Sequence, residues 1–258
     1  MANLLETIYT LWLREILRFV KSKARVVGSG GQPLIWLAII GVGFGSAFTF
    51  SAGGGPSYIT FMAPGIIGMT ILFSSLFAGV NVIWEKQFGF LKEILVAPIP
   101  RVGIVLGKIA GSATVSLITA LVILIVVVFA GIIPLSALSV FGVSVAVLFM
   151  IIISSIFVAL GLIIASTINN IDGFNVVINF LVLPVFFLSG ALFPLDNVPL
   201  WMRILAAIDP LFYAVDGMRG ALIGLHTYPL YLDFAAVFAI CVLFVAIADV
   251  AFRRMQSK

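Results

Sequence analysis

Charged residues are scarce in this sequence of 258 residues. Asp, Glu, Lys and Arg together make up 9% of it, whereas soluble domains carry about a quarter. Two long stretches, 26–84 and 109–171, contain none of these four residue types. Each is long enough for two membrane crossings, because one crossing takes about 20 apolar residues. The scarcity of charge therefore excludes an ordinary soluble domain and predicts an all-α integral membrane protein.

Cysteine and histidine occur once each, as Cys241 and His226. One cysteine cannot form an internal disulfide, and the two residues together cannot supply the three or four ligands of a zinc site. A Ser-His-Asp arrangement would depend on His226 alone. We therefore expect no metal site and no catalytic residues, which leaves a membrane-embedded enzyme as a weak alternative.

A phosphate-binding P-loop is also missing. That loop needs a Gly, four residues, and then Gly-Lys followed by Ser or Thr. The only Gly-Lys pair is Gly107-Lys108, but Ile109 follows it and Val102 stands where the first Gly belongs. This chain is therefore not expected to bind ATP by that route.

Apolar residues, in contrast, make up 63% of the chain. Turn residues and charges divide them into six predicted transmembrane helices, at about 34–50, 58–84, 104–130, 138–167, 174–193 and 230–252. Ahead of them, 4–25 has polar residues at helical spacing on one face, which predicts an interfacial amphipathic helix that ends at the Gly-rich stretch 28–33. We expect one transmembrane domain over 1–258, with 1–33 as interfacial helix and linker, 34–193 as spans one to five, 194–229 as an outer segment and 230–258 as span six and tail.

The outer segment, 194–229, is apolar but contains the breaker Asp209-Pro210 and three charged residues, Arg203, Asp216 and Arg219. Neither half resembles a lipid-facing crossing. The pattern predicts two short re-entrant helices. We expect Asp216 and Arg219 to be held by each other or by Arg203.

The orientation follows from the basic residues, which are retained on the cytoplasmic side. With six spans, twelve of the fourteen Lys and Arg residues fall on the side of the termini, and only Arg203 and Arg219 fall on the other. Both termini are therefore predicted to be cytoplasmic. The net charge of +4 comes from residues at the membrane edges, which favours lipid headgroups over nucleic acid as the partner.

The loop after the second span, 85–101, reads Glu-Lys-Gln-Phe-Gly-Phe-Leu-Lys-Glu-Ile-Leu-Val-Ala-Pro-Ile-Pro-Arg. Its apolar residues recur at helical spacing, and Pro98 and Pro100 end the pattern. The loop is therefore predicted to form a short amphipathic cytoplasmic helix. Such a helix could rest on lipid or bind a protein.

This loop resembles the acidic-basic, Gly, Leu-Glu-Leu-Leu, Pro pattern of type-2 ABC exporter permeases. A second block, Leu-Pro-Val-Phe-Phe-Leu-Ser-Gly-Ala-Leu-Phe-Pro at 183–194 with Asp-Pro-Leu-Phe-Tyr at 209–213 and Asp-Gly-Met-Arg-Gly at 216–220, is similar to the drug-resistance and nodulation-factor branch of that family. The size and the six-span layout extend the resemblance over nearly the whole chain.

The resemblance implies a permease of a prokaryotic plasma membrane that exports drugs, lipids or glycolipids. It implies two copies of the permease and two of a separate ABC ATPase, which binds ATP and Mg. The loop helix would contact that ATPase through Glu85, Lys86, Phe88, Phe90, Leu91, Lys92, Glu93, Ile94 and Leu95. The outer pair, with Arg203, Asp216 and Arg219, would close the pathway.

The family arrangement would place the pathway between the two copies, where spans two and five meet. The polar candidates there are Ser74, Ser75, Asn81, Asn175 and Asn179. Hydrogen bonding between helices is the competing role for these side chains. A polysaccharide exporter permease and a stand-alone secondary transporter or channel remain alternatives for the whole chain.

Overall fold

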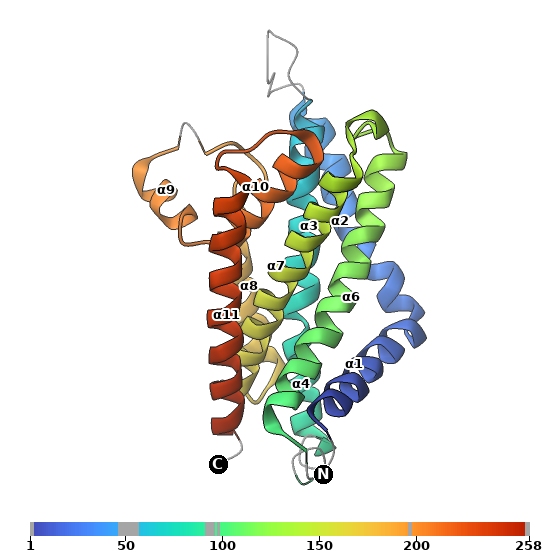
Figure 1. The fold of residues 1–258 in the computed structure, drawn as a ribbon, viewed down its shortest axis with the longest axis vertical. Helices are drawn as coiled ribbons and strands as arrows, with labels where there is room; N and C mark the ends of the chain where they lie inside the picture. The colour runs from blue at the N-terminus through green and yellow to red at the C-terminus, as the bar shows by residue number, and fades with distance from the viewer. Residues whose placement is uncertain (1–2, 46–56, 91–95, 97–98, 196–197, 256–258) are drawn as a thin grey trace.

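The computed structural model describes residues 3–45, 57–90, 96, 99–195 and 198–255. Helices run through these ranges, and Figure 1 shows most of them standing side by side as a bundle, with both termini at the same end. The elements are α1 (Leu4–Lys21), α2 (Lys23–Gly45), α3 (Tyr58–Leu76), α4 (Ala78–Gln87), α6 (Arg101–Phe129), a 3-10 turn (Leu135–Ala137), α7 (Val140–Thr167), α8 (Ile171–Leu188), α9 (Leu200–Ala206), α10 (Pro210–Ile223) and α11 (Leu230–Met255).

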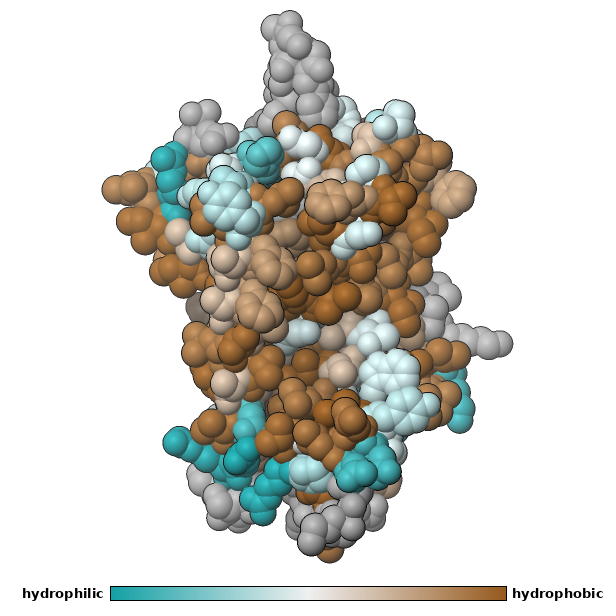
Figure 2. Space-filling model, viewed as in Figure 1, coloured by the Kyte–Doolittle hydropathy of each residue, from teal (hydrophilic) through white to brown (hydrophobic). Residues whose placement is uncertain are grey.

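Five helical segments of the described chain are long and apolar enough to cross a membrane. They are Tyr58–Gln87, which joins α3 to α4, Arg101–Phe129, Val140–Thr167, Ile171–Leu188 and Leu230–Arg254. Figure 2 shows a broad hydrophobic band around the middle of the molecule, with hydrophilic side chains gathered mostly at its lower end. The all-helical membrane fold is therefore confirmed, and five of the six expected crossings correspond to helical segments long and apolar enough to span a membrane. The first expected crossing, 34–50, overlaps the shorter apolar helix Gly31–Gly43, so the sixth crossing stays a prediction.

The break predicted at 28–33 is wrong, because α2 runs through it from Lys23 to Gly45 with Pro33 inside the helix. Each glycine in a helix costs about 1 kcal/mol relative to alanine. An unsatisfied backbone group in an apolar environment costs several kcal/mol, so a helix is the better solution there even for a glycine-rich segment. The linker between α1 and α2 is consequently only Ser22.

Helix α1 lies obliquely along α6 in Figure 1 and packs mainly against it. The buried residues of α1 are Thr7, Leu11, Glu15 and Phe19, which recur every four residues and so share one face. Two of these four, Thr7 and Glu15, are polar. The face of α1 that packs on protein is therefore not its purely apolar face.

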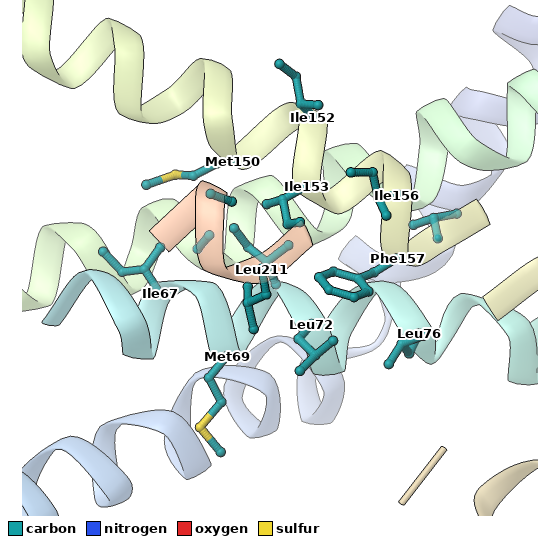
Figure 3. Close-up of a cluster of buried hydrophobic side chains, with 14 of the residues drawn as sticks. Ile67, Met69, Leu72, Leu76, Met150, Ile152, Ile153, Ile156, Phe157 and Leu211 are labelled. Carbon is teal, nitrogen blue, oxygen red and sulfur yellow. The ribbon is translucent and has the colours of Figure 1, made fainter. Parts of the chain in front are cut away.

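The core is formed chiefly by α3 and α7, with α10 against them (Figure 3). Ile67, Leu72 and Leu76 from α3 meet Ile153 and Phe157 from α7, and all five are at most 1% exposed. Glycines let these helices approach closely where they cross. A Cβ on Gly161 would lie 2.8 Å from the backbone oxygen of Leu76, closer than real Cβ atoms come.

The outer segment forms two short helices, α9 and α10, as predicted. Asp209 begins α10 by accepting a hydrogen bond from the Leu211 N–H (2.9 Å), and Pro210 occupies the first turn. Gly224 ends the helix in the left-handed conformation (φ 73°). The position of these helices relative to the membrane stays a prediction.

Candidate coupling site

The C-terminal end of α4 is where the predicted cytoplasmic helix was to begin. The structure assigns Glu85, Lys86 and Gln87 to α4 itself, as the last residues of the 30-residue apolar segment. Gly89 follows with φ +79°, which stops the helix, because a glycine adopts this conformation without strain. The prediction of a continuous helix that begins at Glu85 is therefore wrong. Of the rest of that helix, Leu91, Lys92, Glu93, Ile94 and Leu95 lie outside the described residues.

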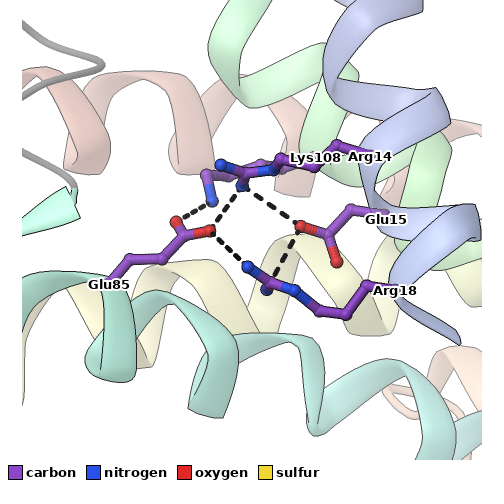
Figure 4. Close-up of polar contacts among 5 residues, drawn as sticks. All are labelled: Arg14, Glu15, Arg18, Glu85 and Lys108. Atoms are coloured by element: carbon purple, nitrogen blue, oxygen red, sulfur yellow. Dashed lines mark hydrogen bonds and ion pairs between the residues drawn. The ribbon is translucent and has the colours of Figure 1, made fainter. Parts of the chain in front are cut away.

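Glu85 is the centre of a charged network that joins three helices (Figure 4). Its carboxylate accepts hydrogen bonds from Arg14 of α1 and Lys108 of α6, and Arg18 lies 3.7 Å away. Glu15 contacts Arg14 at 3.3 Å and Arg18 at 3.7 Å. Glu85 and Lys108 are both only 3% exposed, so these charges depend on each other rather than on water.

Lys86 and Gln87 hold the opposite side of the α4 end. The ammonium group of Lys86 donates to the backbone carbonyl of Ser166 (3.2 Å) and to the side-chain oxygen of Asn169 (3.3 Å), at the C-terminus of α7. The side-chain amide of Gln87 donates to the Asn169 carbonyl (3.2 Å). A cation at this position forms hydrogen bonds with carbonyls that have no partner within the helix, and it interacts favourably with the negative end of the helix dipole. The end of α4 is thus fixed to α1, α6 and α7.

Beyond this anchor, the apolar side chains face outward. Phe88 is 62% exposed and stacks on Trp84 with the ring centroids 5.2 Å apart, and Phe90 is 57% exposed. Val96 is exposed as well. The residues predicted to contact an ATPase therefore divide into two groups. Glu85 and Lys86 are engaged within the chain, whereas Phe88 and Phe90 are accessible.

Three glycines of α6 make the close contact with α1 possible. Gly103, Gly107 and Gly111 lie four residues apart on one face. A Cβ on Gly107 would lie 2.9 Å from the Leu11 Cβ and 3.2 Å from the backbone of Ile8. Sequence reasoning missed this contact, although the Gly-x-x-x-Gly spacing was a signal that could have found it.

The pathway candidates do not all form one group. Ser74 and Ser75 of α3 both share hydrogen bonds with Ser116 of α6 (3.1 and 3.0 Å), so they connect two helices as the competing role predicts. Ser74 and Asn81 of α4 line the same cavity beside α1. Asn175 is half-buried and Asn179 exposed, both on α8 and so separated from that cavity.

At the outer end, Asp216 and Arg219 are buried but do not form an ion pair with each other. Asp216 accepts hydrogen bonds from the N–H groups of Thr227 (2.8 Å) and Tyr228 (2.9 Å). The expected mutual pair is replaced by backbone partners, which satisfy a buried charge equally well.

Arg219 is held by backbone and by a ring. It donates to the carbonyls of Gly190 (2.9 Å) and Phe61 (3.3 Å), with its guanidinium 3.8 Å from the Phe61 ring centroid. Burial lowers the pKa of Arg219 to about 10, so it stays charged at neutral pH. Arg203 lies at the surface on α9, 3.5 Å from the Leu195 carbonyl.

Two further aspartates differ in their surroundings. Burial raises the pKa of Asp209 to about 8, although the hydrogen bond from the Leu211 N–H opposes the shift. The other carboxylate oxygen of Asp209 has no hydrogen-bond partner among the described residues. On α11, Asp249 pairs with Arg253 at 2.8 Å, four residues further along the helix.

Comparison with known proteins places this architecture among transport permeases. Residues 6–223 match the family model described as ABC-2 type transporter. The putative transport permease ycf38 of Pyropia yezoensis is 31% identical over 84% of this chain and 74% of its own length. The inner membrane transport permease YadH of Escherichia coli K12 is 26% identical over 91% of this chain and 90% of its own. Nodulation protein J of Rhizobium leguminosarum is 26% identical over 83% and 81%.

Proposed function

Since this chain belongs to the ABC-2 type transporter family, we propose that it is the membrane subunit of an exporter driven by a separate ATPase. The family makes the chain an ABC transporter permease. Export, and a hydrophobic or amphipathic cargo such as a drug, lipid or glycolipid, belong to the proposal. So do its placement in a prokaryotic plasma membrane and its cytoplasmic termini.

The observation that carries the proposal is the anchored end of α4 beside two exposed aromatic side chains. Glu85 and Lys86 fix this end to three helices, and Phe88 and Phe90 then leave the bundle surface. A rigidly held apolar protrusion suits a surface that must transmit force from a partner. We assign the docking of the ATPase, which would bind ATP and Mg, to this protrusion and to the loop that follows it.

The proposed assembly has two permeases and two ATPases. The apolar segment of α8 is only 22% buried within one chain and that of α11 only 11%, so both leave apolar surface for lipid or for a second permease copy, and we assign the second copy to α8. Phe180 is 83% exposed there and Asn179 is exposed beside it. The cargo pathway would then lie between copies, with Asp216 and Arg219 near its outer mouth.

Co-purification with a candidate ABC ATPase, sought first among the neighbouring genes, tests the proposal. Burying one large apolar side chain contributes about 1.5–3 kcal/mol, so Phe90→Ala should weaken association by roughly 10- to 100-fold. Phe141→Ala is the matched control, since Phe141 is also exposed (74%) but lies at the start of α7. Membrane levels of both variants should equal the wild type.

Two results would count against the proposal. Undiminished ATPase recovery with Phe88→Ala and Phe90→Ala combined would remove the docking role from this protrusion. Transport by the permease alone in proteoliposomes, with no ATPase present, would favour a stand-alone transporter.

A further inference from the structure

A cavity of about 340 Å³ lies between the α1–α2 corner and helices α3, α4 and α6. Its volume falls within the range of small-molecule sites, roughly 300–1,000 Å³. Its lining is mixed. The larger apolar side chains are Phe19, Met69, Phe73 and Phe77, and the polar ones are Glu15, Gln32, Thr70, Ser74, Asn81 and Ser112.

A second hollow adjoins it toward the charged end of the bundle. It has a volume of about 480 Å³ and shares Asn81 with the first. Arg18, Ser22, Trp84, Glu85, Phe88 and Phe90 also line it. The combined space thus has a part of mixed lining inside the bundle and a charged part with an indole, which is the side chain typical of the headgroup level of a bilayer.

The charged network beside this part has one more positive than negative charge, because Arg14, Arg18 and Lys108 face the two carboxylates of Glu15 and Glu85. Of these residues, Arg18 and Glu85 line the second hollow and Glu15 lines the first. Arg18 is the outermost of the three basic residues, 41% exposed, and both of its carboxylate contacts are long at 3.7 Å. Its guanidinium therefore has N–H donors left for a phosphate, which arginine binds well.

The length of the site matches one leaflet of a membrane. Its lining runs along α3 and α4 from Met69 to Trp84, which at 1.5 Å per residue is about 22 Å. Half of a bilayer, headgroups included, is about 20–22 Å thick. A soluble anion would use only the charged part and leave the part inside the bundle unfilled.

We propose that the two hollows form one binding site for an anionic phospholipid of the leaflet at the charged end of the bundle. An acyl chain lies between Phe19, Met69 and Phe73, and the phosphate is bound by Arg18. The site is contained within one copy of the chain, so this inference does not depend on export or on the ATPase.

Native mass spectrometry of the purified full chain tests it, with phosphatidylglycerol and phosphatidylcholine of identical acyl chains as probes. We expect one phosphatidylglycerol per chain, bound at least 10-fold more tightly than phosphatidylcholine. Ser112→Phe, which fills the cavity, should weaken phosphatidylglycerol binding at least 10-fold. Ser144→Phe, at an exposed position of α7, should leave it unchanged. Arg18→Gln should abolish the preference between the two lipids.

A second measurement covers the case in which Ser112→Phe fails to fold. Ser112→Cys in a Cys241→Ser background should react with a lipid-soluble maleimide, and phosphatidylglycerol should slow the reaction at least 5-fold. Equal affinity for the two lipids, or no protection of the thiol, would overturn the proposal. So would unchanged phosphatidylglycerol binding by a folded Ser112→Phe variant.

Discussion

The substitution Glu85→Gln removes the carboxylate that contacts Arg14, Arg18 and Lys108. Lys108 is 3% exposed, and its ammonium would lose the negative charge to which it donates a hydrogen bond without gaining access to water. Leaving one partner of a buried ion pair alone typically costs about 3–5 kcal/mol. At roughly 2–4 °C per kcal/mol for a chain near this size, the melting temperature should fall by about 6–20 °C.

The size of this effect should depend on Lys108. Lys108→Met alone leaves Glu85 paired with Arg14, which is 32% exposed, so its cost should be smaller than that of Glu85→Gln. The double variant has no buried ammonium without a partner. It should therefore melt at a higher temperature than Glu85→Gln alone, although two residues are changed.

Size-exclusion chromatography after heating in detergent measures all three variants. Asp249→Asn is the control, because it breaks the ion pair with Arg253, which is 50% exposed, and should cost less than about 1 kcal/mol. The reasoning is refuted if Glu85→Gln melts no lower than this control, or if the double variant melts below Glu85→Gln.

Three further predictions concern packing, pH and topology. Gly107→Val should destabilise the chain by about 1–3 kcal/mol because α1 must move, whereas Gly43→Val should not, since a Cβ there meets nothing within 4 Å; thermal melting compares them. Asp209 has a pKa near 8 in the folded chain and near 3.8 in the unfolded chain, so it binds its proton more tightly when folded. The stability of the fold should therefore decrease as the pH rises from about 4 to 8. Asp209→Asn should make this pH dependence weaker, as measured by thermal melts at several pH values. A Gly55→Cys variant lacking Cys241 should react with an impermeant thiol reagent from outside intact cells; protection there and labelling in inverted vesicles would reverse the predicted topology.

The long helices were predictable from the sequence because the backbone N–H and C=O groups of a long apolar segment must be hydrogen-bonded within that segment. The expected spans 104–130 and 138–167 differ from α6 and α7 by no more than three residues at each end. In an apolar environment the helix satisfies every backbone group within the segment. Turn residues alone were a poorer guide, as the glycine-rich start of α2 shows.

Side-chain partners were harder to predict than helices. The periodicity of 4–25 located an amphipathic helix but not the partner on which it packs, so Glu15 on its buried face was missed. The loop pattern likewise grouped Glu85 with Phe88, although one is buried and the other exposed. Which charge turns inward depends on Lys108, which is distant in sequence and adjacent only in the fold.

The ion pair between Glu85 and Lys108 connects the end of α4 with the beginning of α6, on the two sides of the loop between these helices. The loop begins after Gln87 and ends at Arg101, and Lys108 lies about 10 Å along α6 from that end. A force on the loop should therefore move α4 and α6 together, and α1 with them through Arg14.

Docking and transmission can be separated on this basis. Glu85→Gln should retain the ATPase, since Phe90 is untouched. ATP-driven transport by this variant should nevertheless be lower than in the wild type, even when it is measured well below the melting temperature of the variant. Phe90→Ala should lower both in proportion. Co-purification and transport by the same reconstituted preparations measure the two quantities. If Glu85→Gln lost association and transport to the same degree, the charged network would belong to the docking surface and not to the connection behind it.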